Sequence, residues 1–218
     1  MIIAIDGPAG SGKSTLGRML ARALNLLYID TGSMYRAVAL ATINAALDPA
    51  NTEAVTELAQ RVDINLEGDP DSMRVWLQGQ DVTERIREDD ITEMSSIVST
   101  IPGVRRAMVA RQRELGKRGA VMNGRDIGTV VFPDADIKFF LDAAPEERAE
   151  RRFKEDQVVN PGATLAHTFA EIAERDRRDS TRADSPLKIA SDAIFVDSTG
   201  LSIQATFERM MEHVHRNH

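Results

Sequence analysis

The residues with the clearest chemical meaning form a glycine-rich segment near the N-terminus. It reads Gly7-Pro8-Ala9-Gly10-Ser11-Gly12-Lys13-Ser14-Thr15 and fills every fixed position of the phosphate-binding pattern G-x-x-x-x-G-K-[ST]. Glycines let successive backbone N–H groups turn toward phosphate oxygens, and a following helix adds the positive end of its dipole. Lys13 supplies a cation for the β- and γ-phosphates, and the Ser14 hydroxyl is suited to Mg²⁺. Residues 7–15 therefore predict a nucleoside triphosphate site.

The flanking residues have the patterns that this motif needs. The apolar run Met1-Ile2-Ile3-Ala4-Ile5 precedes the loop and predicts a buried strand. Leu16, Leu20 and Leu24 follow at four-residue spacing, which places them on one face of a helix. A strand, a loop and a helix in this order distinguish a phosphate-binding loop from a chance glycine-rich turn.

The rest of the chain alternates between strand and helix patterns. Further strands are expected at residues 26–29, 120–122, 137–141 and 193–196, and helices at 34–47, 52–61 with Thr52 as the N-cap, 93–116 with a break at 101–103, 145–155, 165–182 and from 202 onward. Ile64, Leu66, Val75 and Leu77 alternate with polar residues and predict a small antiparallel sheet. The expected fold is α/β: a P-loop, three-layer parallel sheet core with an inserted antiparallel subdomain and a helical lid.

Composition limits the classes of function. The 218 residues fit one domain, and a net charge of −7 argues against a general nucleic-acid binder. The chain has no cysteine and no apolar run approaching the roughly 20 residues of a membrane span, and it starts directly in a strand pattern without a secretory leader. We expect a cytoplasmic protein without a membrane or nucleic-acid partner, and a monomer because no heptad seam is present.

Arginines outside the glycine-rich loop suggest which reaction the triphosphate serves. Arg36, Arg125, Arg175 and Arg182 fall after strands or on the expected lid, where they can form a second anion site. No asparagine is followed by lysine, so the guanine-binding signature of a GTPase is absent. Two anion sites favour phosphoryl transfer to a small acceptor. A non-catalytic nucleotide sensor, or arginines in ordinary surface ion pairs, are the alternatives left open.

Four segments together resemble one family over essentially the whole chain. They are the loop at 7–15, Asp30-Thr31-Gly32-Ser33-Met34-Tyr35-Arg36, Gly124-Arg125-Asp126-Ile127-Gly128-Thr129-Val130-Val131-Phe132-Pro133, and Glu174-Arg175-Asp176-Arg177-Arg178-Asp179. The chain resembles bacterial cytidylate kinase, the long form of the nucleoside monophosphate kinases. The resemblance implies one kinase domain with a core (about 1–38, 92–147 and 183–218), a nucleoside monophosphate-binding insert (about 39–91) and a lid (about 148–182).

The resemblance also implies the substrates and the site. It implies transfer from Mg²⁺-bound ATP to CMP or dCMP, with Lys13, Arg148 and Arg152 as catalytic residues and Ser14 as the metal ligand. The implied acceptor-site residues are Thr31, Tyr35, Arg36, Ser96, Arg105, Arg125, Asp126, Arg175, Asp179 and Arg182. Cytosine offers an amine beside two acceptors, so Asp126 would accept from the amine while Arg105 and Ser96 serve the other edge. UMP, AMP or a metabolite hydroxyl is the alternative acceptor, and no single lid arginine is assigned to the moving phosphoryl group.

Overall fold

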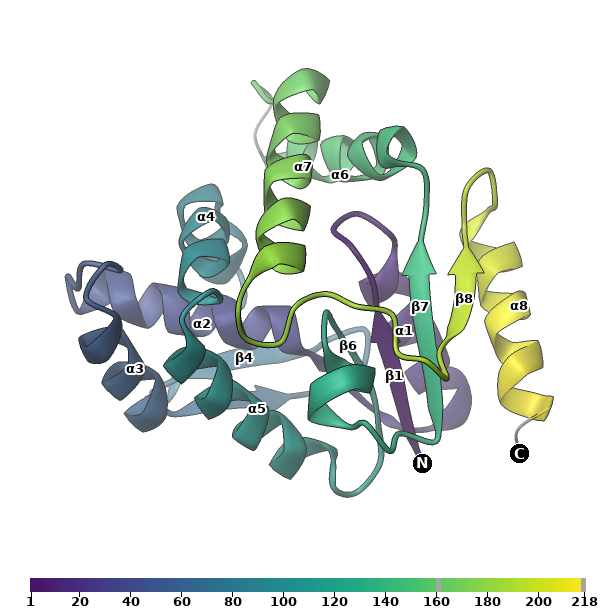
Figure 1. Ribbon diagram of the computed structural model, residues 1–218, viewed down its shortest axis with the longest axis horizontal. Coiled ribbons are helices and arrows are strands. Elements are labelled where there is room, and N and C mark those ends of the chain that lie inside the picture. The colour runs from purple at the N-terminus through teal and green to yellow at the C-terminus, as the bar shows by residue number, and fades with distance from the viewer. Residues whose placement is uncertain (160–161, 217–218) are drawn as a thin grey trace.

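The computed structural model describes residues 1–159 and 162–216, so residues 160–161 of the expected loop between the lid helices lie outside it. The described chain contains a five-stranded sheet and a separate three-stranded sheet (Figure 1). The larger sheet consists of β1 (Ile2–Asp6), β2 (Leu27–Asp30), β6 (Ala120–Gly124), β7 (Ile137–Asp142) and β8 (Ile194–Asp197). Its strand order is β2-β6-β1-β7-β8, and all neighbouring pairs are parallel. The carboxyl ends of all five strands therefore share one edge.

Helices cover both faces of the parallel sheet, as the alternation along β1 requires. Ile3 and Ile5 pack against α1 (Lys13–Leu24) and α8 (Ile203–Arg216), whereas Ala4 packs on the opposite face with α5 (Pro102–Gly116). A short π-helical turn, η2 (Ile127–Val131), also covers that second face. The three-layer α/β core predicted from the sequence is confirmed.

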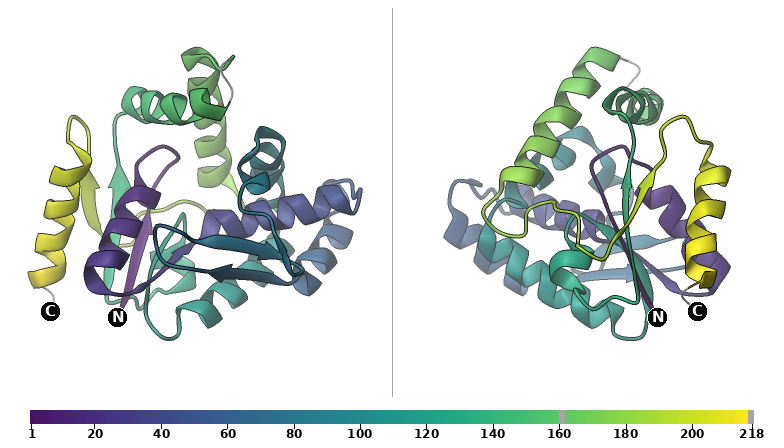
Figure 2. Two further views of the ribbon diagram at one scale, coloured as in Figure 1. Left: turned by 180° about the vertical axis from the view of Figure 1, so that it is seen from behind. Right: turned by 45° about the vertical axis from the view of Figure 1, so that its right-hand side comes forward.

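The second sheet lies with a group of helices beside the core (Figures 1 and 2). Its antiparallel strands are β3 (Ile64–Glu67), β4 (Arg74–Leu77) and β5 (Gln80–Asp81), and its accompanying helices are α2 (Thr31–Asn44), α3 (Thr52–Arg61), the 3-10 turn η1 (Arg85–Arg87) and α4 (Asp89–Val98). Ile64, Val75 and Leu77 are buried in one cluster with the apolar face of α2. The antiparallel sheet predicted from the alternation of apolar and polar residues is therefore confirmed, and one of its faces is buried.

Two helix starts differ from the sequence-based expectation because side-chain caps decide them. The Oδ1 atom of Asn51 accepts from the Ala54 N–H at 3.2 Å, so Asn51 and not Thr52 caps α3. Helix α2 begins at Thr31, earlier than the predicted residue 34, because Asp30 Oδ1 accepts from the Gly32 N–H at 3.0 Å. The helix therefore starts directly at the carboxyl end of β2.

Helices α6 (Pro145–Val159) and α7 (Leu165–Thr181) stand beyond the carboxyl edge of the parallel sheet, and α7 lies beside α4 (Figures 1 and 2). Within residues 1–159 and 162–216, no helix has both the length and the apolar character needed to cross a bilayer.

Asp6, the last residue of β1, joins two segments that are distant in the sequence. Its two carboxylate oxygens accept from the N–H groups of Ile127 at 2.8 Å and Gly128 at 2.7 Å. The side chain is almost fully buried, and this burial raises the pKa of Asp6 to about 6, although both backbone donors favour the carboxylate. Asp6 therefore fixes η2 to the strand that leads into the glycine-rich loop.

The raised pKa predicts how Asp6 changes stability with pH. The folded protein holds the proton up to a pH near 6, whereas the unfolded chain releases it near the ordinary value of 3.8. The stabilisation that protonation gives is complete below the unfolded pKa and is lost as the pH rises through the folded pKa. From about pH 4.5 to about pH 7.5, we expect the unfolding free energy of the wild type to fall by about 2 kcal/mol relative to Asp6→Asn.

Urea titrations of both proteins across that pH range measure the difference. The Asn side chain does not titrate, so the comparison cancels the contributions of all other groups. Parallel pH profiles for the two proteins would contradict the prediction.

Candidate active site

The glycine-rich loop occupies the carboxyl end of β1 and leads directly into α1. Gly7, Gly10 and Gly12 have positive φ angles of 152°, 73° and 93°. A Cβ atom on Gly7 would lie 2.0 Å from the Leu141 carbonyl oxygen, and one on Gly10 would lie 2.6 Å from the Arg148 carbonyl oxygen. Both positions therefore require glycine, for the backbone conformation and for close approach to β7 and α6. The loop ends at the α1 N-terminus, which favours an anion.

Lys13 points back into this loop. Its Nζ atom donates to the Pro8 carbonyl at 2.5 Å and to Ser11 Oγ at 3.2 Å, and the side chain is buried. Burial lowers the pKa of Lys13 well below its ordinary value, and the nearby Arg125 and Arg175 guanidinium groups lower it further. The carboxylates of Asp176 and Asp6 oppose this lowering without outweighing it. A buried cation near two guanidinium groups is stabilised by an arriving anion, so the loop is suited to phosphate.

Ser14, the predicted metal ligand, lies beside a residue that the sequence analysis did not select. The Asn123 Nδ2 atom donates to Ser14 Oγ at 3.2 Å, and the buried Asn123 Oδ1 has no hydrogen-bond partner among the described residues. No cluster of three or more His, Asp or Glu residues suitable for a metal occurs in residues 1–159 and 162–216. Hydroxyl and amide oxygens beside phosphate oxygens fit a hard cation such as Mg²⁺, which keeps most of its other ligands as water.

Five of the ten predicted acceptor-site residues form a largely buried ion-pair network. Arg105 Nη2 and Asp126 Oδ2 are 2.5 Å apart, and their side chains are 2% and 5% exposed. Asp179 pairs with Arg125 at 2.8 Å and with Arg182 at 3.1 Å. Arg182 Nη2 also lies 3.9 Å from Asp126 Oδ1, which connects the Asp179 ion pairs with the Arg105–Asp126 pair. These residues come from α5, the ends of β6 and α7, and the segment after α7.

The network favours the charged form of Asp179 and leaves two guanidinium donors without a hydrogen-bond partner among the described residues. Burial acts to raise the pKa of Asp179, but the Arg125, Arg175 and Arg182 cations outweigh it and hold that pKa below its ordinary value. Arg105 Nε and Arg182 Nη2 are buried without a hydrogen-bond partner in the described chain. An incoming polar ligand can satisfy these two donors.

Tyr35 and Thr31 project from the first turns of α2 toward the same region. The Arg105 guanidinium carbon lies 5.3 Å from the centre of the Tyr35 ring, in a cation–π contact. Burial raises the pKa of Tyr35 to about 12, so its hydroxyl stays protonated. The Thr31 hydroxyl donates to the Asn123 carbonyl at 2.8 Å. Thr31 therefore ties α2 to β6 and keeps only acceptor capacity for a ligand.

Arg36 and Arg175 form the cationic part of the site. Arg36 Nη2 pairs with Asp30 Oδ2 at 3.3 Å, and Arg36 Nε is buried without a partner in the part of the chain described. Burial lowers the pKa of Arg175 to about 10, and the neighbouring Arg125, Arg36 and Arg152 cations contribute to this shift. Repulsion among these arginines is relieved when an anion lies between them.

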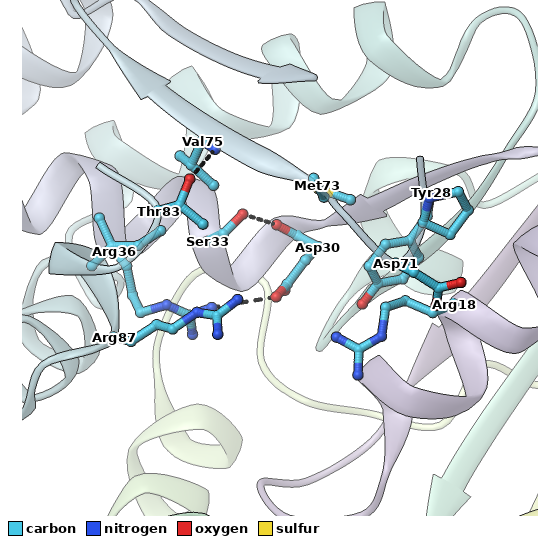
Figure 3. Close-up of a pocket in the computed structure, with 12 residues that line it drawn as sticks. Arg18, Tyr28, Asp30, Ser33, Arg36, Asp71, Met73, Val75, Thr83 and Arg87 are labelled. Atoms are coloured by element: carbon cyan, nitrogen blue, oxygen red, sulfur yellow. Dashed lines mark hydrogen bonds and ion pairs between the residues drawn. The ribbon is translucent and has the colours of Figure 1, made fainter. Parts of the chain in front are cut away.

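Figure 3 shows Arg36 and Asp30 in a pocket between the parallel sheet and the inserted sheet. Arg18, Tyr28 and Arg87 also line this pocket, whose cavity volume is about 70 Å³. Small-molecule sites usually enclose roughly 300–1,000 Å³. The cavity is therefore smaller than a typical small-molecule site.

The two predicted lid arginines have different surroundings. Arg148 is buried, and its Nη1 atom donates to the Ala9 carbonyl at 2.9 Å and to Asp176 Oδ2 at 2.5 Å. Asp176 Oδ1 in turn accepts from the Ala9 N–H at 3.0 Å. Arg152 is partly exposed and pairs with Asp156 at 2.8 Å. Arg148 therefore holds the glycine-rich loop to the lid, whereas Arg152 pairs within its own helix.

Ser96 lies on α4, where its hydroxyl accepts from Arg178 Nη1 at 2.9 Å. Ser99 caps the end of the same helix, and its carbonyl accepts from Arg105 Nη1 at 3.3 Å. Helix α4 therefore contacts both Arg178 of the lid and Arg105 of the network.

Five residues that the sequence analysis did not select take part in this site: Asp6, Asp30, Gln112, Asn123 and Asp176. Gln112 is the clearest example, because both polar atoms of its amide are buried without a hydrogen-bond partner in the described chain. Its position seven residues after Arg105 places both on one face of α5. The seven-residue spacing could have pointed to Gln112 as a neighbour of Arg105. Helical spacing alone, however, does not show which part of the protein that face of α5 contacts.

Comparisons with known proteins agree with this geometry. The Cytidylate kinase family model matches residues 3–216. A cytidylate kinase of Solibacter usitatus (strain Ellin6076) is 49% identical over 97% of this chain and 91% of its own length. A cytidylate kinase of Bacillus subtilis (strain 168) is 45% identical over 97% of this chain and 95% of its own length.

A solved structure, the crystal structure of an uncharacterized protein from Eubacterium ventriosum ATCC 27560, matches with a TM-score of 0.56 at 13% identity. The match covers 99% of this chain and 98% of that one. This likeness shows the fold alone. The family model and the relatives show more: the chain belongs to the cytidylate kinase family.

Proposed function

We propose that this protein transfers the γ-phosphoryl group of ATP to CMP or dCMP, forming ADP and CDP or dCDP. Family membership supports the reaction. The observation that carries it is the joint position of two sites at one sheet edge: the glycine-rich loop after β1 and the Arg105–Asp126 pair after β6. Because β1 and β6 are adjacent parallel strands, the proposed donor and acceptor sites follow the carboxyl ends of neighbouring strands, where α/β sheets bind ligands.

On the donor side, the loop N–H groups and Lys13 would bind the β- and γ-phosphates of ATP. Lys13 leaves its contacts with Pro8 and Ser11 when phosphate oxygens replace them. Ser14, with Asn123 beside it, would hold the divalent cation, proposed as Mg²⁺. The bound cation neutralises charge on the phosphate oxygens, and the chain's own groups orient those oxygens.

On the acceptor side, different residues would bind the three parts of the nucleotide: the base, the sugar and the phosphate. Asp126 accepts from the cytosine amine, while Arg105 and Ser96 serve the other edge. Arg175 with Asp179 would hold the sugar, and Arg36, Arg125 and Arg182 would bind the phosphate or the adjoining base edge, with Tyr35 and Thr31 as the wall. An acceptor phosphate oxygen is already nucleophilic, so the site needs positioning and charge neutralisation rather than a strong base.

We infer that closure of two segments completes the site: the insert at about 39–91 and the lid at about 148–182. For the insert, the small pocket between its sheet and β2 supports this, because the cavity is smaller than a typical small-molecule site. Arg148 and Arg152 would approach the transferring group as the lid closes. We further propose a monomer that works in the cytoplasm.

Acceptor-dependent ADP production tests the function. Mg²⁺-bound ATP is supplied with CMP, dCMP, UMP, AMP or GMP in parallel reactions. Preferential turnover of CMP and dCMP supports both the reaction and the base pocket. Preferential turnover of another nucleotide would keep a kinase but contradict the base assignment. ATP binding without turnover of any acceptor would contradict phosphoryl transfer.

Replacing Lys13 by methionine should separate turnover from acceptor binding. Methionine preserves much of the side-chain length and lacks the charge that the moving phosphoryl group needs. We expect kcat to fall by about 10²–10³-fold, the usual effect of losing one transition-state contact, while the Kd for CMP changes by less than about threefold. Steady-state kinetics and calorimetric CMP titration measure the two quantities, and wild-type turnover in Lys13→Met would contradict the proposed mechanism.

Replacing Asp126 by asparagine should weaken the choice of base. The asparagine amide can donate to the O4 atom of uracil, whereas the carboxylate only accepts. We expect kcat/KM for CMP to fall by about 10–100-fold with a smaller loss for UMP, because a charge-assisted hydrogen bond contributes about 1.5–3 kcal/mol. Kinetics with both acceptors give the ratio, and the KM for ATP is the control. If the ratio of kcat/KM for CMP to kcat/KM for UMP is unchanged, Asp126 does not take part in base recognition.

A further inference from the structure

Two adjacent arginines on lid helix α7 have different partners. Arg177 is exposed and makes two hydrogen bonds of 2.8 Å to the Glu174 carboxylate. Arg178 uses Nε to donate to Glu174 Oε1 at 3.0 Å and Nη1 to donate to Ser96 Oγ at 2.9 Å. Both arginines pair with Glu174, and among the side-chain contacts of the described residues Arg178 alone of the two reaches another helix.

The Arg178–Ser96 hydrogen bond links two structural units. Its partners are 82 residues apart in the sequence and lie on α7 and α4, which stand side by side in Figures 1 and 2. The end of the same α4 helix is tied to Arg105 through the Ser99 carbonyl. Arg178 therefore contacts the helix that also borders the Arg105–Asp126 pair.

Arg178 is held in place for this contact. Glu174 lies one turn earlier on α7 and fixes Nε, while the guanidinium plane carries Nη1 toward α4. The hydrogen bond from Arg177 lowers the pKa of Glu174 to about 2, and Arg178 contributes to this lowering. Glu174 is therefore a carboxylate at physiological pH and can accept from Arg178 Nε.

The hydroxyl of Ser96 keeps one donor and one acceptor position for a ligand. A serine hydroxyl has one hydrogen and two lone pairs, and Arg178 occupies one lone pair. The hydroxyl hydrogen has no acceptor among the hydrogen bonds of the described residues. A hydroxyl that accepts from a guanidinium is polarised and becomes a stronger donor. Cytosine presents acceptors at N3 and O2, whereas uracil carries a hydrogen on N3.

We propose that Arg178 is a positioning residue for base recognition: it orients the Ser96 hydroxyl toward the cytosine edge and links the base pocket to lid helix α7. The proposal rests on the proposed function, since Ser96 takes this role only if cytosine fills the pocket. When cytosine accepts from the Ser96 hydroxyl, the Arg178–Ser96 hydrogen bond between α7 and α4 is strengthened. A base that cannot accept from Ser96 leaves this hydrogen bond weaker.

Four variants test this role: Arg178→Ala, Arg178→Lys, Ser96→Ala and the double variant Ser96→Ala with Arg178→Ala. Arg177→Ala is the matched control, because it removes a neighbouring arginine from the same Glu174 and leaves Ser96 untouched. The measurements are kcat and KM for CMP, UMP and ATP, with the thermal midpoint of each variant. These values separate recognition from folding.

We expect Arg178→Ala to raise the KM for CMP about three- to tenfold, the usual effect of one hydrogen bond, and to leave the KM for ATP unchanged. The kcat/KM preference for CMP over UMP should fall by a similar factor. Arg178→Lys should recover part of it, because an ammonium group can still donate to the hydroxyl. In the Ser96→Ala background, the loss of Arg178 should add little.

Other outcomes would overturn the role of Arg178. They are equal losses for CMP and UMP, additive effects of the Ser96 and Arg178 changes, or the same loss in Arg177→Ala. A wild-type protein that turns over UMP or AMP but not CMP would instead contradict the proposed function, and with it the role of Ser96. The wild-type acceptor panel is therefore measured first, so that the two failures are distinguished.

Discussion

The site depends on one carboxylate that holds two loops together. Asp6 ends the strand that enters the phosphate-binding loop, and its oxygens accept from the backbone N–H groups of Ile127 and Gly128. Asp126 directly precedes those two residues and carries the ion pair with Arg105. A shift of the Asp6 side chain would therefore move the glycine-rich loop on one side and Asp126 on the other. Under the proposed function, this one side chain sets the relative position of the donor and acceptor sites.

The described chain collects more cations at this edge than its carboxylates neutralise. Asp126 and Asp179 pair with Arg105, Arg125 and Arg182, which sets two carboxylates against three cations. Arg175 and the buried Lys13 add two further basic groups, whose pKa values are lowered by burial and like charge. Two polyanionic nucleotides supply the missing negative charge. In the proposed mechanism, bound nucleotides relieve this repulsion, and the cations stabilise the transition state once the two segments have closed.

Much of the fold was predictable from the sequence because its elements depend on local patterns. The strands, the helix after the loop and the antiparallel sheet follow from apolar periodicity, and helix 52–61 has the predicted length. The π-helical turn at Ile127–Val131 was not predicted, because its conformation depends on Asp6, which lies far away in the sequence. The same reason explains the missed Asn123 and Asp176: their types are common, and only the folded chain shows that they contact Ser14 and Ala9.

In the proposed mechanism, the contacts of helix α7 couple recognition of the acceptor base to binding of the donor phosphates. Helix α7 carries Asp176, which accepts from the loop N–H of Ala9, and Asp179, which pairs with Arg125. Arg178 on the same helix reaches Ser96. Because one rigid helix touches the donor loop, the acceptor network and α4, it cannot adjust to one of them independently. Phosphoryl transfer needs water excluded only when both nucleotides are in place, and a helix that contacts both sites meets that requirement.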